Sequence, residues 1–190
     1  MHTAVFSDEF VKQGTWYSSC HAVWEILDFK KDRLLLKGAW PYLPITQVWE
    51  LAPKENCFAW KVDIDIFAPV YIKKQRAGIM FTEDYNCWEV SGLCSGMFPA
   101  EFCPVAWENL YRGRGSKLGL SRKAEQPGET QLPRIYFSCF QKGDDFDAAL
   151  ENSSSAFNGR QLTFEKISGN ESQVIGPAAH RYFHGEITFG

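Results

Sequence analysis

The stretch from Cys57 to Gly92, CFAWKVDIDIFAPVYIKKQRAGIMFTEDYNCWEVSG, decides the fold class of this chain. Apolar and polar side chains alternate through its first part: Trp60, Lys61, Val62, Asp63, Ile64, Asp65 and Ile66. A period of two residues is typical of a β-strand with one buried face and one solvent-exposed face. Two further strand-like runs follow, over Ile72–Phe81 and Asn86–Ser91. We expect the three runs to form a β-meander, in which consecutive strands pair with one another.

Strand-like runs recur along the rest of the chain. They are Ala22–Ile26, Arg33–Lys37, Thr46–Leu51, Arg134–Phe140, Arg160–Ile167 and Arg181–Phe189. Many short strands separated by Gly, Pro and Asn turns indicate an all-β sandwich or barrel. The segment Asp144–Asn152 is the exception, because acids at its start and good helix formers behind them predict a short helix. We expect the last strand to pair with the N-terminal strand and so fix both chain ends.

Length and composition favour one domain over residues 1–190 and exclude several classes of protein. The 190 residues suffice for a substantial core, and 45% of them are hydrophobic. A net charge of -3 argues against binding nucleic acid, which needs a basic excess. We expect no membrane span, because no apolar run approaches the ~18–20 residues required. The N-terminus carries no secretory signal, which favours a cytoplasmic location.

The sequence predicts neither a metal site nor another cofactor. Its six cysteines contain no Cys-x-x-Cys pair of the kind that structural zinc uses, and we favour free thiols, with disulfides as the alternative. His180 and His184 are four residues apart, but on a strand their rings lie about 13 Å apart, too far to share a metal ion. No nucleophile elbow, phosphate-binding loop or dinucleotide fingerprint is present. The sequence therefore leans toward a non-catalytic protein, without deciding the question.

Acidic residues on the alternating strand are candidates for binding or for acid–base chemistry. Asp63 and Asp65 share one strand face, roughly 7 Å apart, and Glu83 occupies a later turn. Carboxylates on neighbouring strands can act on a glycosidic bond. The alternative is a solvated sheet face, on which cross-strand lysines and arginines neutralise the acids.

Aromatic residues in turns are the remaining signal of function. They are harder to assign to a core than aromatics inside alternating strands, and their flat apolar faces can stack on sugar rings while polar groups bind hydroxyls. Eight residues make up the predicted ligand site. The predicted platforms are Trp40, Tyr42, Tyr85 and Trp88, and the predicted hydroxyl partners are Asp63, Asp65, Glu83 and Asn86.

Several segments together resemble the concanavalin A-like jelly-roll domains attached to glycoside hydrolases and lectins. They are VFSDEF, GTW and LLLKG near the start, then FAWKVDIDI, AGIMFTEDYNCWEV and the closing YFHGEITFG. The likeness covers roughly residues 4–92 and 180–190. It implies an antiparallel two-sheet β-sandwich that binds carbohydrate.

A second resemblance is to the lipocalins. Gly14-Thr15-Trp16-Tyr17 is similar to their opening motif, and Thr82-Glu83-Asp84-Tyr85 to one of their turns. Arg112 would then pack on the opening Trp. This likeness implies a closed barrel around an apolar ligand, but the chain ends in strands where a lipocalin has a helix.

We therefore favour a carbohydrate-binding, lectin-like β-sandwich domain, acting alone or as a module of a larger carbohydrate-active protein. One alternative is an enzyme that acts on a glycan or small metabolite through its acidic sheet face. The other is the lipocalin-like barrel. Each implies a glycan or small-molecule ligand, and none fixes the oligomeric state.

Overall fold

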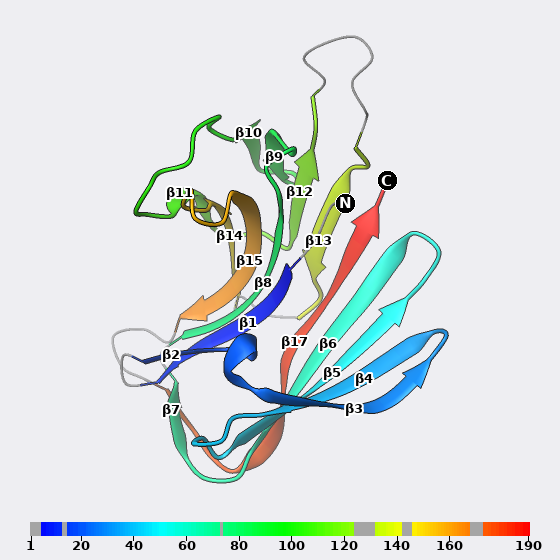
Figure 1. The fold of residues 1–190 in the computed structure, drawn as a ribbon, viewed down its shortest axis with the longest axis vertical. Helices are drawn as coiled ribbons and strands as arrows, with labels where there is room; N and C mark the ends of the chain where they lie inside the picture. Colours follow the sequence, from blue (N-terminus) through cyan, green and yellow to red (C-terminus); the bar gives the residue numbers. More distant parts are fainter. Residues whose placement is uncertain (1–4, 13–14, 73, 124–131, 142–145, 168–172) are drawn as a thin grey trace.

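A computed structural model describes the chain except for residues 1–4, 13–14, 73, 124–131, 142–145 and 168–172. The described residues form two large antiparallel sheets and one small one (Figure 1). The six-stranded sheet has the order β11 (Glu108–Gly113), β14 (Asp147–Asn152), β15 (Gly159–Ile167), β8 (Lys74–Thr82), β1 (Val5–Lys12) and β2 (Thr15–Ser18). The nine-stranded sheet has the order β10 (Cys94–Met97), β9 (Cys87–Val90), β12 (Lys117–Ser121), β13 (Ile135–Cys139), β17 (Ala178–Phe189), β6 (Cys57–Ile66), β5 (Ile45–Pro53), β4 (Arg33–Ala39) and β3 (Val23–Lys30).

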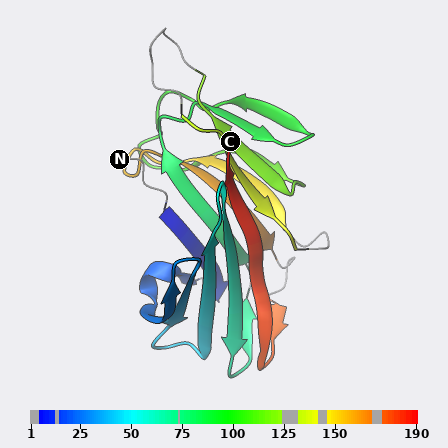
Figure 2. The ribbon, with the colours of Figure 1, turned by 90° about the vertical axis from the view of Figure 1, so that its right-hand side faces the viewer.

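Two small elements complete the fold. β7 (Val70–Ile72) pairs with β16 (Gln173–Ile175), and a short 3-10 helix, η1 (Ser19–His21), follows β2. Figure 2 shows β17, in red, running up to the C-terminus along the nine-stranded sheet.

The main core lies between the two large sheets and is rich in aromatic rings. Trp60 and Phe183 come from the nine-stranded sheet, with ring centroids 5.1 Å apart. Phe137 of the same sheet meets Phe164 of the six-stranded sheet at 4.9 Å. All four side chains are fully buried. Aromatic contacts of this kind stabilise a core beyond the area they bury, so the cluster joins the sheets into a β-sandwich.

The alternation in the stretch quoted at the outset correctly predicts which side chains of β6 are buried and which are exposed. Trp60, Val62 and Ile64 are buried, whereas Asp63 and Asp65 are exposed on the outer face of the nine-stranded sheet. The predicted strand with one buried face is therefore confirmed.

The β-meander predicted for this stretch is wrong. β6 and β9 belong to the nine-stranded sheet, whereas β8 between them belongs to the six-stranded sheet. The chain changes sheet after β6 through β7, and changes back after β8. Alternation specifies which face of a strand is buried, but not which strand lies beside it.

The short helix predicted near 144–152 is also wrong for residues 147–152, while 144 and 145 lie outside the described residues. Residues 147–152 form β14, which pairs with β11 on one side and with β15 on the other. Five consecutive residues of β14, from Ala148 to Asn152, are buried. Pairing on both sides and burial on both faces outweigh a helix propensity worth only tenths of a kcal/mol per residue.

The chain ends are fixed differently from our prediction, and the sheets remain open. β17 lies between β13 and β6, whereas β1 lies between β8 and β2. The edges of the large sheets are four different strands, so the lipocalin-like closed barrel is excluded. None of the six cysteines forms a disulfide. In the described part of the chain, no helix is long and apolar enough to cross a membrane.

Candidate functional site

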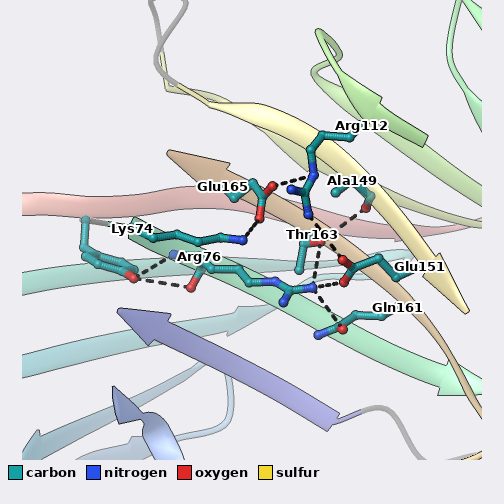
Figure 3. A network of polar contacts seen from close by, with 9 residues as sticks. Lys74, Arg76, Arg112, Ala149, Glu151, Gln161, Thr163 and Glu165 are labelled. Atoms are coloured by element: carbon teal, nitrogen blue, oxygen red, sulfur yellow. Dashed lines mark hydrogen bonds and ion pairs between the residues drawn. The ribbon is translucent and has the colours of Figure 1, made fainter. Parts of the chain in front are cut away.

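The outer face of the six-stranded sheet carries a cluster of charged and polar side chains, which we call the polar face. Its members are Lys74, Arg76, Arg112, Glu151, Gln161, Thr163 and Glu165 (Figure 3). They share this face because strands alternate: on β15, Leu162 and Phe164 point into the core. The register then brings Arg76 opposite Glu165.

Cations and carboxylates of the polar face form a continuous network. Lys74 Nζ lies 2.5 Å from Glu165 Oε2, and Arg112 Nε lies 2.9 Å from Glu165 Oε1. Arg112 Nη2 also lies 3.5 Å from Glu151 Oε1, so one guanidinium bridges both carboxylates. Arg76 donates to Glu151 and, over 3.1 Å, to Gln161 Oε1. Figure 3 shows these contacts converging between β8, β15 and β14.

The network is buried although it faces away from the main core. Glu165 is 1% exposed, and Glu151, Gln161 and Thr163 are also buried. Buried ion pairs cost much desolvation free energy and add little net stability compared with apolar side chains. A structure that keeps such a costly cluster of buried charges has a reason other than stability to keep it. The polar face is therefore a candidate site for recognition or proton transfer.

A second candidate site is a hollow of about 300 Å³ at one end of the sandwich, which we call the end hollow. It lies between the β8–β9 turn, the loop after β10, the end of β12 and the start of β15. Its lining consists of Glu83, Asp84, Asn86, Ala100, Phe102, Arg122 and Arg160. The lining thus combines carboxylates, an amide, guanidinium groups and one aromatic ring.

Arg160 is the most buried residue of this lining, at 3% exposed. Its Nε donates to the Tyr85 carbonyl over 3.1 Å, its Nη1 to Asn152 Oδ1, and its Nη2 to the Glu83 carbonyl over 3.5 Å. Its guanidinium also lies over the rings of two phenylalanines, Phe98 and Phe102, at 4.8 and 4.5 Å. Burial lowers the pKa of Arg160 from its ordinary value, and the charge of Glu83 partly opposes that shift.

Hydrogen bonds hold the other polar groups of the end hollow in place. Asn86 Nδ2 donates to the Lys123 carbonyl over 3.0 Å, and the Lys123 amide donates to Asn86 Oδ1 over 2.8 Å. Asp84 accepts a hydrogen bond from Thr82 Oγ1 over 3.0 Å and lies 3.7 Å from Arg122. The amide of Asn86 is thus used to fix the chain after β12.

A third candidate site is a second hollow, of about 320 Å³, which contains two of the predicted platforms and which we call the aromatic hollow. Its lining is mostly apolar: Tyr17, His21, Trp40, Pro41, Tyr42 and Leu43. Trp40 is 3% exposed and donates from Nε1 to the Ser18 carbonyl over 3.2 Å. Tyr42 is 95% exposed and offers a free ring face.

The remaining predicted residues lie apart from both hollows or in the core. Asp63 pairs with Arg181 on the outer face of the nine-stranded sheet, and Asp65 is exposed beside it on β6. Tyr85 is buried, and its hydroxyl donates to the Pro133 carbonyl over 3.2 Å. Trp88 is half-buried on β9 and donates to the Met97 carbonyl over 3.3 Å.

The structure therefore does not gather the eight predicted residues into one site. It brings Glu83 and Asn86 together in the end hollow, and Trp40 and Tyr42 together in the aromatic hollow. These two hollows lie at opposite ends of β17. The loop with Trp40 leads into β5, whose first residues pair with the end of β6 that lies beside the start of β17. Near the end hollow, Tyr85 bonds the carbonyl of Pro133, and the next residue, Arg134, pairs with Gly190 just after β17 ends. A role for each of the eight in binding stays a prediction.

Sequence reasoning missed Arg160 and the whole polar face. One signal for Arg160 was present, because it stands in the same alternating register as Leu162 and Phe164 and so had to be buried. The contacts described for the polar face join residues between 39 positions apart, as for Arg112 and Glu151, and 91 positions apart, as for Lys74 and Glu165, and no short motif marks them. Among the described residues, no group of three His, Cys, Asp or Glu side chains lies close enough to hold a metal ion.

No protein-family model and no curated protein sequence matches this chain, but solved structures share its fold. A GH36 α-galactosidase, AgaB from Geobacillus stearothermophilus, superposes with a TM-score of 0.55 over 97% of this chain, at 9% identity. The α-galactosidase from Lactobacillus brevis gives 0.53 over 100%, at 11% identity. A putative aldose 1-epimerase from Escherichia coli K12 gives 0.52 over 96%, at 12% identity.

This chain spans 29% and 26% of the two galactosidases and 78% of the epimerase. At such low identity the likeness concerns the fold alone. The fold is a β-rich one that also occurs in carbohydrate-active enzymes.

Proposed function

We propose that this chain is a carbohydrate-binding β-domain that holds a sugar in the end hollow. The observation that carries the proposal is the lining of that hollow: the carboxylates of Glu83 and Asp84, the guanidinium groups of Arg122 and Arg160, and the ring of Phe102. A sugar hydroxyl both donates and accepts hydrogen bonds, so it suits a wall that alternates acceptors with donors. A volume of about 300 Å³ lies at the small end of ligand pockets, as one or two sugar rings require.

The structural neighbours support this proposal because their names are those of carbohydrate-active enzymes. Two are α-galactosidases and one is a putative aldose 1-epimerase, so the fold recurs in proteins of sugar chemistry. Since this chain spans about a quarter of each galactosidase, we further propose that it serves as a module of a larger carbohydrate-active protein. The lectin-like role and the concanavalin A-like relationship belong to the same proposal.

A glycan array probed with the whole chain tests binding, and calorimetry with the best ligand tests its location. Glu83→Gln is the variant of choice, because Glu83 lines the hollow and is exposed, and glutamine keeps its shape while removing its charge. We expect about tenfold weaker binding of a neutral sugar, since a charge-assisted hydrogen bond is lost. Glu25→Gln on the distant edge strand β3 is the matched control and should bind like the unchanged protein.

The aromatic hollow is the rival location for the same function. Tyr42→Ala removes its most exposed ring without touching the core. Loss of binding in Tyr42→Ala, with normal binding in Glu83→Gln, would move the sugar to the aromatic hollow. No binding to any glycan would remove the proposed function.

A second candidate function, sugar-active catalysis, is favoured by the polar face. Its two buried carboxylates, Glu151 and Glu165, are bridged by Arg112 and could exchange protons with a sugar hydroxyl. For a catalytic role we therefore favour Glu151 and Glu165 over Asp63 and Asp65, because Asp63 is paired with Arg181 on a solvent-exposed face. Polarimetry on freshly dissolved aldoses would detect anomer interconversion. Equal rates with and without the protein would remove this candidate.

A further inference from the structure

We infer that the end hollow selects a sugar that carries a carboxylate, and that Arg160 is the group that recognises it. This inference rests on the proposed function, because it names the class of sugar that the same site takes. The observations behind it concern hydrogen-bond capacity, charge balance and the rigidity of one guanidinium group.

Arg160 has hydrogen-bond donors left over. A guanidinium carries five N–H groups. Three of the five are used, by the Tyr85 carbonyl, the Asn152 side chain and the Glu83 carbonyl. One N–H on Nη1 and one on Nη2 therefore have no acceptor among the described residues. A carboxylate has two oxygens and can accept hydrogen bonds from both terminal nitrogens of one guanidinium.

Arg160 also lacks a negatively charged partner. All three of its acceptors are neutral oxygens, and no carboxylate of the described residues lies within ion-pair distance of it. Asp84 is paired with Arg122 and accepts a hydrogen bond from the Thr82 hydroxyl. The side chain of Glu83 is exposed, so solvent screens its attraction. A charge that is 97% buried and unpaired is costly, and an anion bound in the hollow would remove that cost.

The guanidinium is held ready for planar recognition. The rings of Phe98 and Phe102 lie over it at 4.8 and 4.5 Å, and three hydrogen bonds from all three nitrogens fix its plane. Because it is already ordered, binding a carboxylate costs little further side-chain entropy. A lysine would offer one mobile point charge in place of this fixed fork.

The first test uses the unchanged protein and three ligands of one sugar series: a hexuronic acid, its methyl ester and the parent neutral hexose. Calorimetry or ligand-observed NMR should give at least tenfold tighter binding for the acid than for the ester or the hexose. This preference should shrink in high salt, since it depends on charge. Equal affinity of the three ligands would overturn the inference and leave the proposed function intact. If none of the three binds and the glycan array is blank as well, both fall.

The second test changes the protein without disturbing its buried groups. Glu83→Gln removes an exposed negative side chain that lines the hollow and whose charge acts on Arg160. The ratio of acid affinity to neutral-hexose affinity should therefore rise severalfold, whatever happens to each affinity alone. Glu25→Gln should leave that ratio unchanged. A ratio that falls in Glu83→Gln would show that the sugar carboxylate does not approach this end of the hollow, and would overturn the inference.

Discussion

Replacing Glu165 with Gln should destabilise the fold far more than an ordinary surface substitution, because it removes one member of a buried ion pair. The side chain of Glu165 is fully buried, and that of its partner Lys74 is only 14% exposed. Removing one member of a buried ion pair typically costs about 3–5 kcal/mol. Arg112, the other partner, is 40% exposed and can turn to solvent, so we expect the lower end, about 3 kcal/mol. For a chain of this size that corresponds to a Tm lowered by roughly 6–12 °C.

Urea unfolding followed by tryptophan fluorescence measures this loss, provided that the slope with denaturant stays constant. Glu25→Gln is the matched control, because Glu25 and Lys37 form a surface pair whose side chains are 61% and 42% exposed. Its cost should stay below about 0.5 kcal/mol. A loss in Glu165→Gln as small as that of the control would refute the reasoning about burial.

The double variant Lys74→Met with Glu165→Gln isolates the cause. Since methionine removes the buried charge of Lys74 at similar volume, at least half of the lost stability should return. If the losses of unfolding free energy in Lys74→Met and in Glu165→Gln simply add up in the double variant, the two side chains are not coupled and the argument fails.

Three further predictions concern the core, a close contact and pH. Phe137→Ala should lower the free energy of unfolding in urea by about 3–5 kcal/mol, because Phe137 is fully buried between Phe164 and Phe183. Near-normal stability would contradict the core described above. Gly185→Ala should lower the Tm by several degrees, because its Cβ would collide with the carbonyl oxygen of Ser138 on β13; an unchanged Tm would show that the strands can separate. Burial, followed by Lys61 and Arg181, lowers the pKa of His184 in the fold. Around these pH values the unfolded chain therefore binds more protons at His184 than the folded chain does. The stability that neutral His184 contributes is fully present above the unfolded pKa, about 6.5, and is lost as pH falls through the lower folded pKa. His184→Gln should flatten that part of the curve of Tm against pH, and an unchanged curve would assign the slope to other groups.

The sequence predicted local strands well because alternation is a local property. The alternating residues 60–66 and the runs Arg160–Ile167 and Arg181–Phe189 lie in β6, β15 and β17, and the apolar residues of the first run are buried as predicted. Partner choice was not predictable in the same way. β17 pairs with β6 across more than a hundred residues, and no period in either strand records that pairing. The helix predicted over Asp144–Asn152 failed for a related reason. One of the two strands beside β14 is β11, which comes from a distant part of the chain, and no local pattern records that pairing.

The residues of the candidate site show the same difference between what a local pattern predicts and what it cannot predict. Glu83 and Asn86 could be named from the sequence, because polar residues in a turn between two strands are displayed at the end of a sheet. Arg160 could not, although its register required burial, since a buried arginine has meaning only through the groups around it. Its acceptors come from the β8–β9 turn and from β14, and the rings beside it come from the loop after β10. The charge of Arg160 is enclosed by the β8–β9 turn, β14 and the loop after β10, and this arrangement is visible only in the folded chain. Our proposal that the end hollow prefers a sugar with a carboxylate rests on that enclosed charge.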